Sequence, residues 1–350
     1  MTATLGSDTQ PWCRGSARDG RAVRLLRGRG FWRLLLLATL FTPAPQLLPE
    51  SHAQSKLPRV GIIANVRNDP MFEVFERGLA SKGWIKGRSV VLEYRVTGGD
   101  AATIAQAAAE LVRLDVDIIS AWSAPALREV YSATRAIPIV ALDLTTDPVA
   151  AGYADSYNRP GRNVTGVFLD APQFATKWLD ILKTAVPGLS RIAVVWDPAP
   201  GTVHLRAVQG AARSLGVEVQ ALEVRKPEDM EKAFSALRRR PQAIMWLPSP
   251  MMYVNSARSA ELSMRQRLPV ISVWREFAES GGALSYGPIQ PAYLERAAAM
   301  VAGILSGTKP ADLPIERPSE FEFVVNLKTM KALGHSVSDS VLLRADEVIR

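Results

Sequence analysis

From residue 59 onward, the sequence alternates short runs of β-branched residues with longer segments in which apolar residues recur at helical spacing. In the first half of the chain, strands are expected at residues 59–64, 90–94, 116–119 and 137–142. The rhythm restarts after residue 188, with strands expected at residues 192–196, 217–222, 243–247 and 269–274. Helices are expected between these strands, among them residues 125–134, 203–215 and 227–240. Because alternating strands and helices form parallel sheets with helices on both faces, the pattern predicts an α/β protein with two Rossmann-like, doubly wound lobes.

Turn-rich segments mark where these lobes are expected to join. One joint is expected at residues 158–166 and a second near residues 281–287, followed by a helix at 291–305 and a strand at 321–325. The expected division is an N-terminal lobe at residues 54–165, a C-terminal lobe at residues 166–282, and a crossover segment at residues 283–350 that returns between the lobes. Several crossings between two lobes form a hinge and not a loose tether.

The first 53 residues have the pattern of a secretory signal peptide. Seven arginines precede or flank an apolar run of about ten residues at 31–41, which is shorter than the ~20 residues that span a bilayer. Small residues at Ser51 and Ala53 favour cleavage after about Ala53, although a buried helix with an unusual tail is the alternative. Cys13, the only cysteine, lies in the removed part, which suits an oxidising compartment. The sequence therefore predicts export to a bacterial periplasm.

The overall charge of the chain first suggests a nucleic-acid partner. The chain has 42 Lys and Arg against 34 Asp and Glu, a formal net charge of +8. Residues 1–53 hold seven of the basic and three of the acidic residues, which leaves +4 on the remaining 297. The basic excess belongs largely to the signal peptide, so no nucleic-acid partner is expected.

Polar and aromatic residues follow the expected strands, where open parallel sheets bind their ligands. The Ser123-Ala124-Pro125 segment is typical of a helix N-cap, and the helix amides either bind an anion or are simply capped. The tryptophans either stack on a ligand or belong to the core, and the aspartates either bind an amine or hydroxyl or cap a neighbouring turn. The candidate ligand-binding residues are Asn65, Asn68, Trp122, Ser123, Asp143, Thr145, Asp147, Trp196, Ser249 and Trp274.

Signatures of catalysis are weak by comparison. After residue 53 the chain has two histidines, His204 and His335, and neither accompanies a convincing serine–acid pair. His204 is expected on the surface of its helix. The sequence lacks a Walker-type phosphate loop, a Gly-x-Gly-x-x-Gly after a strand, and zinc or calcium spacing, so no catalytic residue, cofactor or metal is expected.

Several long segments resemble the ABC transporter substrate-binding protein family of the TrpX-like type, which binds aromatic amino acids. The similarity extends from about Arg59 to Arg350. It is carried by residues 109–119 (AELVRLDVDII), 158–166 (NRPGRNVTG), 281–287 (GGALSYG), 309–314 (KPADLP), 325–329 (VNLKT) and 344–349 (RADEVI).

The resemblance implies a type I periplasmic-binding-protein fold, in which two lobes close on a small ligand. It implies as partners a small polar or aromatic, amino-acid-like solute and the ABC permease and ATPase subunits of an importer, with the protein itself a monomer. Three alternatives stay open: a binding module of a signalling receptor, an α/β hydrolase or transferase that uses Asp143 or Asp147 as a base, and a transcription-regulator core, which would need a helix-turn-helix where the signal peptide lies.

Overall fold

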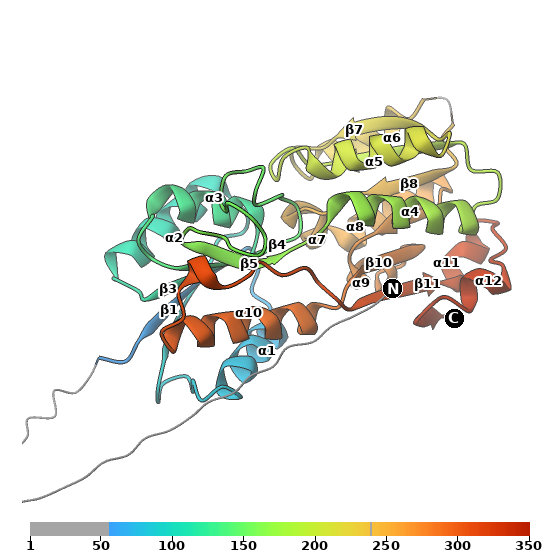
Figure 1. The fold of residues 1–350 in the computed structure, drawn as a ribbon. Helices are drawn as coiled ribbons and strands as arrows, with labels where there is room; N and C mark the ends of the chain where they lie inside the picture. The colour runs from blue at the N-terminus through green and yellow to red at the C-terminus, as the bar shows by residue number, and fades with distance from the viewer. Residues whose placement is uncertain (1–55, 239) are drawn as a thin grey trace, which may run out of the picture. The chain divides into compact units, whose positions relative to one another are not determined.

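The computed structural model describes residues 56–238 and 240–350, and the predicted signal peptide lies outside these described residues. The described chain contains two sheets with helices on both faces, each forming one lobe (Figure 1). Among the described residues, no helix combines the length and the apolar content that crossing a membrane requires.

The first lobe contains a fully parallel sheet of five strands in the order β2-β1-β3-β4-β5. Each strand except the last is followed by a helix or a long loop that returns the chain to the end of the sheet where the next parallel strand begins. The elements are β1 (Arg59–Ala64), α1 (Asp69–Ala80), β2 (Val91–Val96), α2 (Ala101–Arg113), β3 (Ile118–Ala121), α3 (Ala124–Ala133), β4 (Ile139–Asp143) and β5 (Val164–Phe168).

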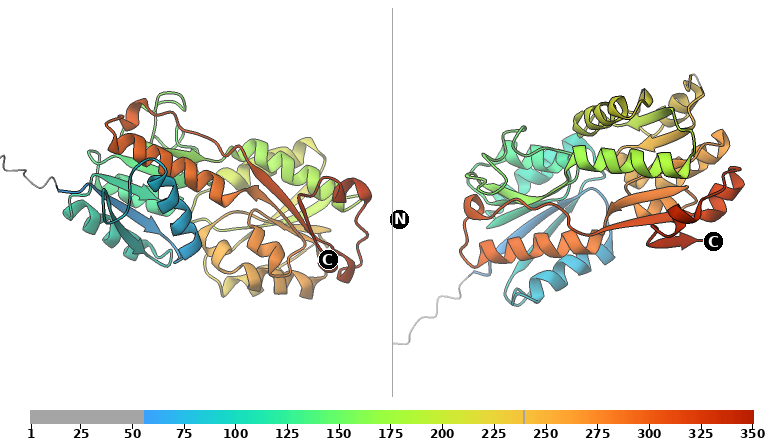
Figure 2. Two further views of the ribbon diagram at one scale, coloured as in Figure 1. Left: turned by 90° about the horizontal axis from the view of Figure 1, so that it is seen from below. Right: turned by 45° about the vertical axis from the view of Figure 1, so that its right-hand side comes forward.

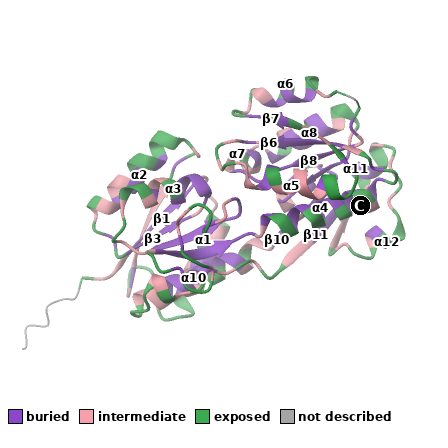
Figure 3. Ribbon diagram, turned by 45° about the horizontal axis from the view of Figure 1, so that its top comes forward, coloured by how far each residue is buried: buried purple, intermediate pink, exposed green. Residues whose placement is uncertain are grey.

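Alternate side chains of β1 point to the two faces of this sheet. Val60 and Ile62 pack in the cluster that includes α1, whereas Ile63 packs with α2 and α3. Gly61 faces α2, where a Cβ atom would lie 2.6 Å from Leu111 Cδ1. The inner strands of both sheets are largely buried, whereas β2 and the two edge strands of the second sheet are only partly buried (Figure 3).

The second lobe contains seven strands in the order β12-β11-β10-β9-β8-β6-β7. β6, β7, β8, β9 and β11 match strands that the sequence pattern predicts. β10 instead occupies residues where the second joint was expected, and β12 was not predicted. Because β11 runs antiparallel to β10, the second sheet is mixed and not wholly parallel as expected. The elements are α4 (Ala171–Ala185), β6 (Arg191–Trp196), α5 (Val203–Ser214), β7 (Glu218–Glu223), α6 (Asp229–Ser235), β8 (Ala243–Trp246), α7 (Pro250–Val254), α8 (Ser256–Gln266), β9 (Val270–Ser272), α9 (Arg275–Glu279), β10 (Leu284–Pro288), β11 (Phe321–Asn326), α11 (Leu327–Ala332), α12 (Asp339–Leu342) and β12 (Glu347–Ile349).

Helix α10 (Gln290–Leu305) leaves the second sheet and packs against α1 and the first sheet. The contact is close because Gly78 of α1 faces Ala298 of α10, and a Cβ atom on Gly78 would lie 2.7 Å from that of Ala298. The short 3-10 helix η1 (Pro310–Asp312) contacts β5, and the chain then returns to the second sheet as β11 (Figure 2).

Within the described residues, three connections therefore join the lobes: residues 169–170, residue 289 and residues 313–320. They are bonded to one another. Arg317 pairs with Asp170 at 3.1 Å, and the Ile289 amide donates to the Glu320 carbonyl at 3.0 Å. Parallel connections of this kind form a hinge between the lobes.

Strand β5 extends the first sheet beyond the boundary expected at residue 165. The sequence predicts a turn-rich joint at residues 158–166. In the structure Gly166 is a strand residue with φ of 146°, and a Cβ atom would lie 2.1 Å from the Ala141 carbonyl oxygen of β4. The glycine allows close approach of two strands and does not end one.

Helix α6 is also shorter than the expected 227–240. It ends at Ser235, where the Ala236 amide bonds the carbonyls of Lys232 and Ala233. Arg238 lies beyond the helix, and its amide donates to Gln220 Oε1 at 2.9 Å. Arg238 and Arg240 therefore both lie outside the helix.

Candidate functional site

A cavity of about 110 Å³ lies between the two lobes. One water needs about 10–15 Å³ by this kind of measure, so the cavity has room for a small organic molecule. Its walls come from the ends of β1, β3 and β4 and the start of α1 in the first lobe, from α7 and Trp274, two residues after β9, in the second, and from the start of α10. The polar and aromatic residues that line it are Asn65, Asn68, Phe72, Trp122, Ser123, Asp143, Thr145, Ser249, Tyr253, Trp274, Gln290 and Tyr293.

Eight of the ten candidate residues from the sequence lie in this wall, and Asp147 and Trp196 do not. Asp147 Oδ1 instead accepts hydrogen bonds from the Val149 and Ala150 amides at 2.9 and 3.0 Å, so its carboxylate caps its own loop. Trp196 is half-buried against the hydrophobic core.

Asp143 is fully buried at the end of β4. Its Oδ1 accepts hydrogen bonds from the Thr145 amide and hydroxyl, both at 2.8 Å, and from the Thr146 amide at 3.1 Å. Its Oδ2 is buried and has no hydrogen-bond partner within the described chain. Burial raises the pKa of the carboxyl group, and the donors from Thr145 and Thr146 oppose that shift. Among the described residues, the arrangement leaves one acceptor atom of Asp143 without a donor beside the cavity.

Ser123 caps helix α3, as the sequence predicts. Its Oγ accepts a hydrogen bond from the Ala126 amide at 3.2 Å, and Pro125 occupies the first turn. The Ser123 hydroxyl donates to Asn65 Oδ1 at 3.4 Å, which ties the β1 and β3 ends together. The N-terminus of α3 thus points its partial positive charge towards the cavity, where Ser123 and Ala124 both line the wall.

Aromatic rings form much of the remaining wall. In the first lobe, the Trp122 ring lies 5.5 Å from Phe72 and 5.4 Å from Phe75, and Trp122 Nε1 donates to Ser120 Oγ at 2.9 Å. In the second lobe, Tyr253 and Trp274 meet edge to face with centroids 5.1 Å apart. The two aromatic groups on opposite lobes are suited to hold a flat ligand between them.

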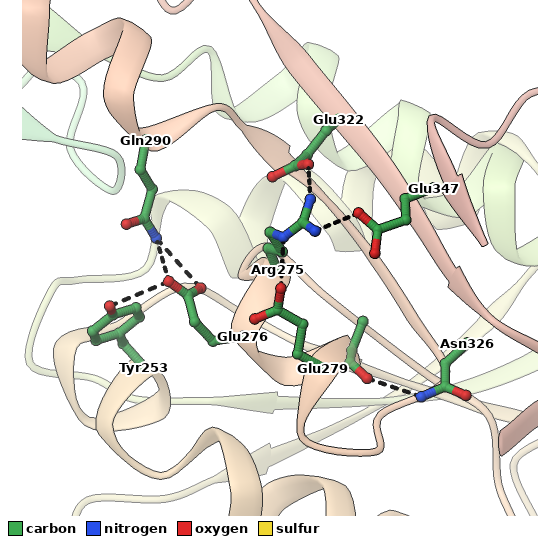
Figure 4. A network of polar contacts seen from close by, with 9 residues as sticks. Tyr253, Arg275, Glu276, Glu279, Gln290, Glu322, Asn326 and Glu347 are labelled. Atoms are coloured by element: carbon green, nitrogen blue, oxygen red, sulfur yellow. Dashed lines mark hydrogen bonds and ion pairs between the residues drawn. The ribbon is translucent and has the colours of Figure 1, made fainter. Parts of the chain in front are cut away.

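Three polar residues of the wall, Tyr253, Gln290 and Tyr293, are not among the candidates from the sequence. Each lies on the first turn of a helix with a proline at its first or second residue, Pro250 in α7 and Pro291 in α10. Helix starts after strand ends are where ligand residues collect, so those prolines were an available signal. Behind them, Glu276 accepts hydrogen bonds from Tyr253 and Gln290 (Figure 4).

His204 is buried, contrary to the expected surface position. Its side chain lies on the apolar face of α5 with Val208 and Ala212, and its Nε2 lies 2.6 Å from the Leu144 carbonyl oxygen. Burial lowers the pKa of the imidazole to about 4, so the neutral form donates through Nε2. The spacing 204, 208 and 212 was a helical stripe that should have indicated burial.

The charges of the wall limit what the cavity can hold. Asp143 is the one charged residue among those that line it, and no lysine or arginine lies among them. Within the described ranges, no group of three or more His, Cys, Asp or Glu is placed to hold a metal ion. An apolar body with a cationic group fits these surroundings.

Comparison with known proteins gives similarities over most of the chain. A family model described as ABC transporter substrate binding protein matches residues 59–349. The tyrosine-binding protein of Clostridioides difficile (strain R20291) is 26% identical over 280 residues, and the match covers 78% of each chain. The solved ABC domain in complex with L-Trp from Streptococcus pneumoniae is 23% identical, with a TM-score of 0.78 over 84% of this chain and 100% of that one. A conserved domain protein from Vibrio cholerae is 24% identical, with a TM-score of 0.77 and the same shares.

Proposed function

The chain belongs to the ABC transporter substrate-binding protein family, and we propose that it binds a small amino-acid-like solute between its lobes for an ABC importer. Its fold is the type I periplasmic-binding-protein fold that the sequence resemblance implies. Binding occurs without turnover, and the solute leaves the cavity chemically unchanged.

The unpartnered Oδ2 of Asp143 is the observation that carries this proposal. A buried carboxylate oxygen without a donor is costly, and an ammonium group removes that cost. A hydrogen bond to a charged group contributes about 1.5–3 kcal/mol, the largest single polar contribution available in this wall. The ligand therefore presents its amine to Asp143.

The negatively charged carboxylate of an amino acid complements the partial positive charge at the N-terminus of helix α3. A carboxylate at its N-terminus meets the Ala124 amide and the helix dipole beside Ser123. The ligand body lies between Trp122 on one lobe and Tyr253 and Trp274 on the other. A micromolar affinity needs about 8 kcal/mol in total, which these polar contacts and the aromatic burial together supply.

The names of relatives support an aromatic amino acid as the solute class. The curated relative is a tyrosine-binding protein, and one structural neighbour was solved with L-Trp. Asn65, Asn68, Thr145 and Ser249 offer further hydrogen bonds around the cavity. Asp147 and Trp196 lie outside this wall and are not assigned a role in binding.

The proposal extends to the partners and location that the family implies. Residues 1–53 direct export and are removed after about Ala53, and the remaining chain acts as a monomer in the periplasm. Its lobes close on the solute as two units about the connections at 169–170, 289 and 313–320. The closed form then delivers the solute to a membrane permease driven by an ATPase.

The test is a thermal-shift screen of residues 54–350 against the twenty L-amino acids. A ligand at 100 times its Kd stabilises the folded state by about 2.7 kcal/mol, so L-tyrosine or L-tryptophan should raise the Tm by several degrees. The bound solute should be recovered unchanged by mass spectrometry. Absence of a shift with every amino acid, or recovery of a converted product, would contradict the proposal.

A further inference from the structure

A hydrogen bond joins the lobes beside the cavity. Asn68 of the first lobe donates from Nδ2 to the Tyr253 hydroxyl of the second lobe at 3.2 Å. Both residues are half-buried, and both line the cavity wall. This contact exists only when the lobes lie close together, so its strength contributes to the balance between open and closed forms.

The orientation of the Asn68 amide is fixed from its own lobe. Asn68 is the N-cap of α1, and its Oδ1 accepts a hydrogen bond from the Met71 amide at 3.3 Å. Since the oxygen of the amide is used by the helix, the NH₂ group is the end that faces Tyr253. Asn68 can therefore only donate to the tyrosine.

The Tyr253 hydroxyl accepts a hydrogen bond from Asn68 and donates its own proton to a second partner. It has one proton to donate, and Glu276 Oε1 lies 3.3 Å away as the acceptor. A carboxylate accepts only, so it forces the hydroxyl proton towards itself and leaves the oxygen lone pairs for Asn68. The raised pKa of Tyr253, about 12, which burial and Glu276 cause, keeps this proton on the phenol.

The Glu276 carboxylate is also bonded to a residue next to the hinge. Gln290 Nε2 donates to Glu276 Oε1 at 3.2 Å and to Oε2 at 3.4 Å, and Gln290 directly follows the connection at residue 289 (Figure 4). The preceding residue, Arg275, pairs with Glu322 of β11 and Glu347 of β12, which fixes helix α9 against these two strands. The carboxylate is thus placed by the hinge and by the second sheet.

We propose that Glu276 is a positioning residue for lobe closure: it orients the Tyr253 hydroxyl so that this group accepts the interlobe hydrogen bond from Asn68. Glu276 does not line the cavity and acts through Tyr253. The proposal uses the two-lobed closure of the proposed function, but its test needs no ligand. Failure of the solute screen and failure of this positioning role are therefore separate results.

The experiment measures the ratio of closed to open molecules by single-molecule energy transfer. Residues 54–350 form one compact unit and contain no cysteine, so dyes are attached through Lys82→Cys in the first lobe and Lys226→Cys in the second. Both lysines are exposed. The ratio is recorded without ligand for the parent and for Tyr253→Phe, Glu276→Gln and their combination.

Loss of one hydrogen bond should lower the closed-to-open ratio about two- to ten-fold in Tyr253→Phe. Glu276→Gln should lower it as well, because the amide NH₂ competes as a donor and the hydroxyl is no longer fixed. The combination should be no lower than Tyr253→Phe alone, because Glu276 acts through the hydroxyl. The matched control Glu279→Gln changes a carboxylate of the same helix that bonds Arg275 and should leave the ratio unchanged.

A second variant tests the same contact if Glu276→Gln folds poorly. Asn68→Ser keeps an efficient N-cap for α1 but removes the Nδ2 donor, so it should lower the ratio as much as Tyr253→Phe, without further loss when the two are combined. The proposal would be overturned if Glu276→Gln lowered the closed-to-open ratio equally in the parent and in Tyr253→Phe, or if it changed the ratio in neither. An unchanged ratio in Asn68→Ser would also overturn it.

Discussion

His204 Nε2 lies 2.6 Å from the main-chain oxygen of Leu144, which joins helix α5 of the second lobe to the segment after β4 in the first. The other ring nitrogen, Nδ1, is buried and has no hydrogen-bond partner within the described chain. Since Leu144 also lines the cavity, the histidine fixes a segment that carries Asp143 and Thr145. The neutral imidazole fits this position, and a protonated one would bury an unpaired N–H.

The stability of the protein should therefore fall in mild acid. Burial lowers the pKa of His204 to about 4 in the folded state, against about 6.5 in the unfolded chain. Below pH 6.5 the unfolded chain binds the proton first, so the contribution of the neutral imidazole is full above that pH and is lost as pH falls towards 4. Between pH 7 and pH 4.5 the loss should amount to about 2–2.5 kcal/mol in the free energy of unfolding, measured by denaturant titration at the two pH values.

A variant isolates this histidine from the carboxylates that titrate in the same range. His204→Gln should show a smaller fall in unfolding free energy between the two pH values than the parent does. His335→Gln, at a turn after α11, serves as the control and should follow the parent. An identical fall in all three proteins would show that His204 does not supply the dependence.

Asp143→Asn should weaken solute binding without weakening the fold. Asparagine keeps a carbonyl oxygen that accepts from Thr145 and Thr146, but it carries a neutral NH₂ group in place of the acceptor Oδ2. The affinity for an amino acid should therefore fall about 10- to 150-fold. Since burial raises the pKa of this carboxyl, its charge costs stability at neutral pH, and the ligand-free Tm should not decrease. Calorimetry gives the affinity and thermal unfolding gives the Tm.

Asp147→Asn is the matched control for that measurement. Asp147 follows the same strand but caps its own loop outside the cavity wall. Its affinity should stay within about two-fold of the parent. A loss as large as that of Asp143→Asn would contradict the assignment of the amine to Asp143.

Gly166→Ala and Gly210→Ala should change stability in opposite directions. At Gly166 φ is 146° and a Cβ atom would overlap the Ala141 carbonyl, so alanine should cost at least about 2 kcal/mol of unfolding free energy. Gly210 lies within α5 and a Cβ atom there meets nothing within 4 Å, so alanine should stabilise by about 0.5–1 kcal/mol. Denaturant unfolding of the two variants decides whether β5 belongs to the first sheet as described.

Arg275→Met should loosen the C-terminal strands selectively. Arg275 bonds Glu279 of α9, Glu322 of β11 and Glu347 of β12, and these acceptors raise its pKa. Because the group is partly exposed, the loss in global stability should be only about 1 kcal/mol. Hydrogen exchange should speed up in residues 347–349 and not in β6 or β8. Uniform exchange throughout the second sheet would contradict a local role.

Much of this fold was predictable because strand and helix periods are local properties. The helix face of Phe72, Phe75 and Leu79 is identified from spacings of three and four residues. The strand at 59–64 is likewise identified from its short apolar run. The cap at Ser123 was equally local. The direction of β11 was not predictable in this way, because it depends on the long return through α10 and η1.

The sequence predicted that the site lies at the strand ends, but it did not determine which individual side chains line the cavity. Asp143 and Asp147 both follow the fourth strand, and the turn made by Thr145 and Thr146 decides which carboxylate is buried. Tyr253 and Gln290 enter the wall through helices whose placement depends on packing of the lobes. Glu276 is recognisable only from those two contacts, since nothing in its own sequence neighbourhood sets it apart from Glu279.

The most direct test of the central claim compares solutes that differ only in the amine. Calorimetry on residues 54–350 should use L-tryptophan and L-tyrosine beside indole-3-propionate and 3-(4-hydroxyphenyl)propionate, which keep the ring and the carboxylate. Because the amine is proposed to satisfy Asp143 Oδ2, at least one amino acid should bind, and its deaminated analogue should bind about 10- to 150-fold more weakly. Equal affinity for the amino acid and its analogue would contradict the account.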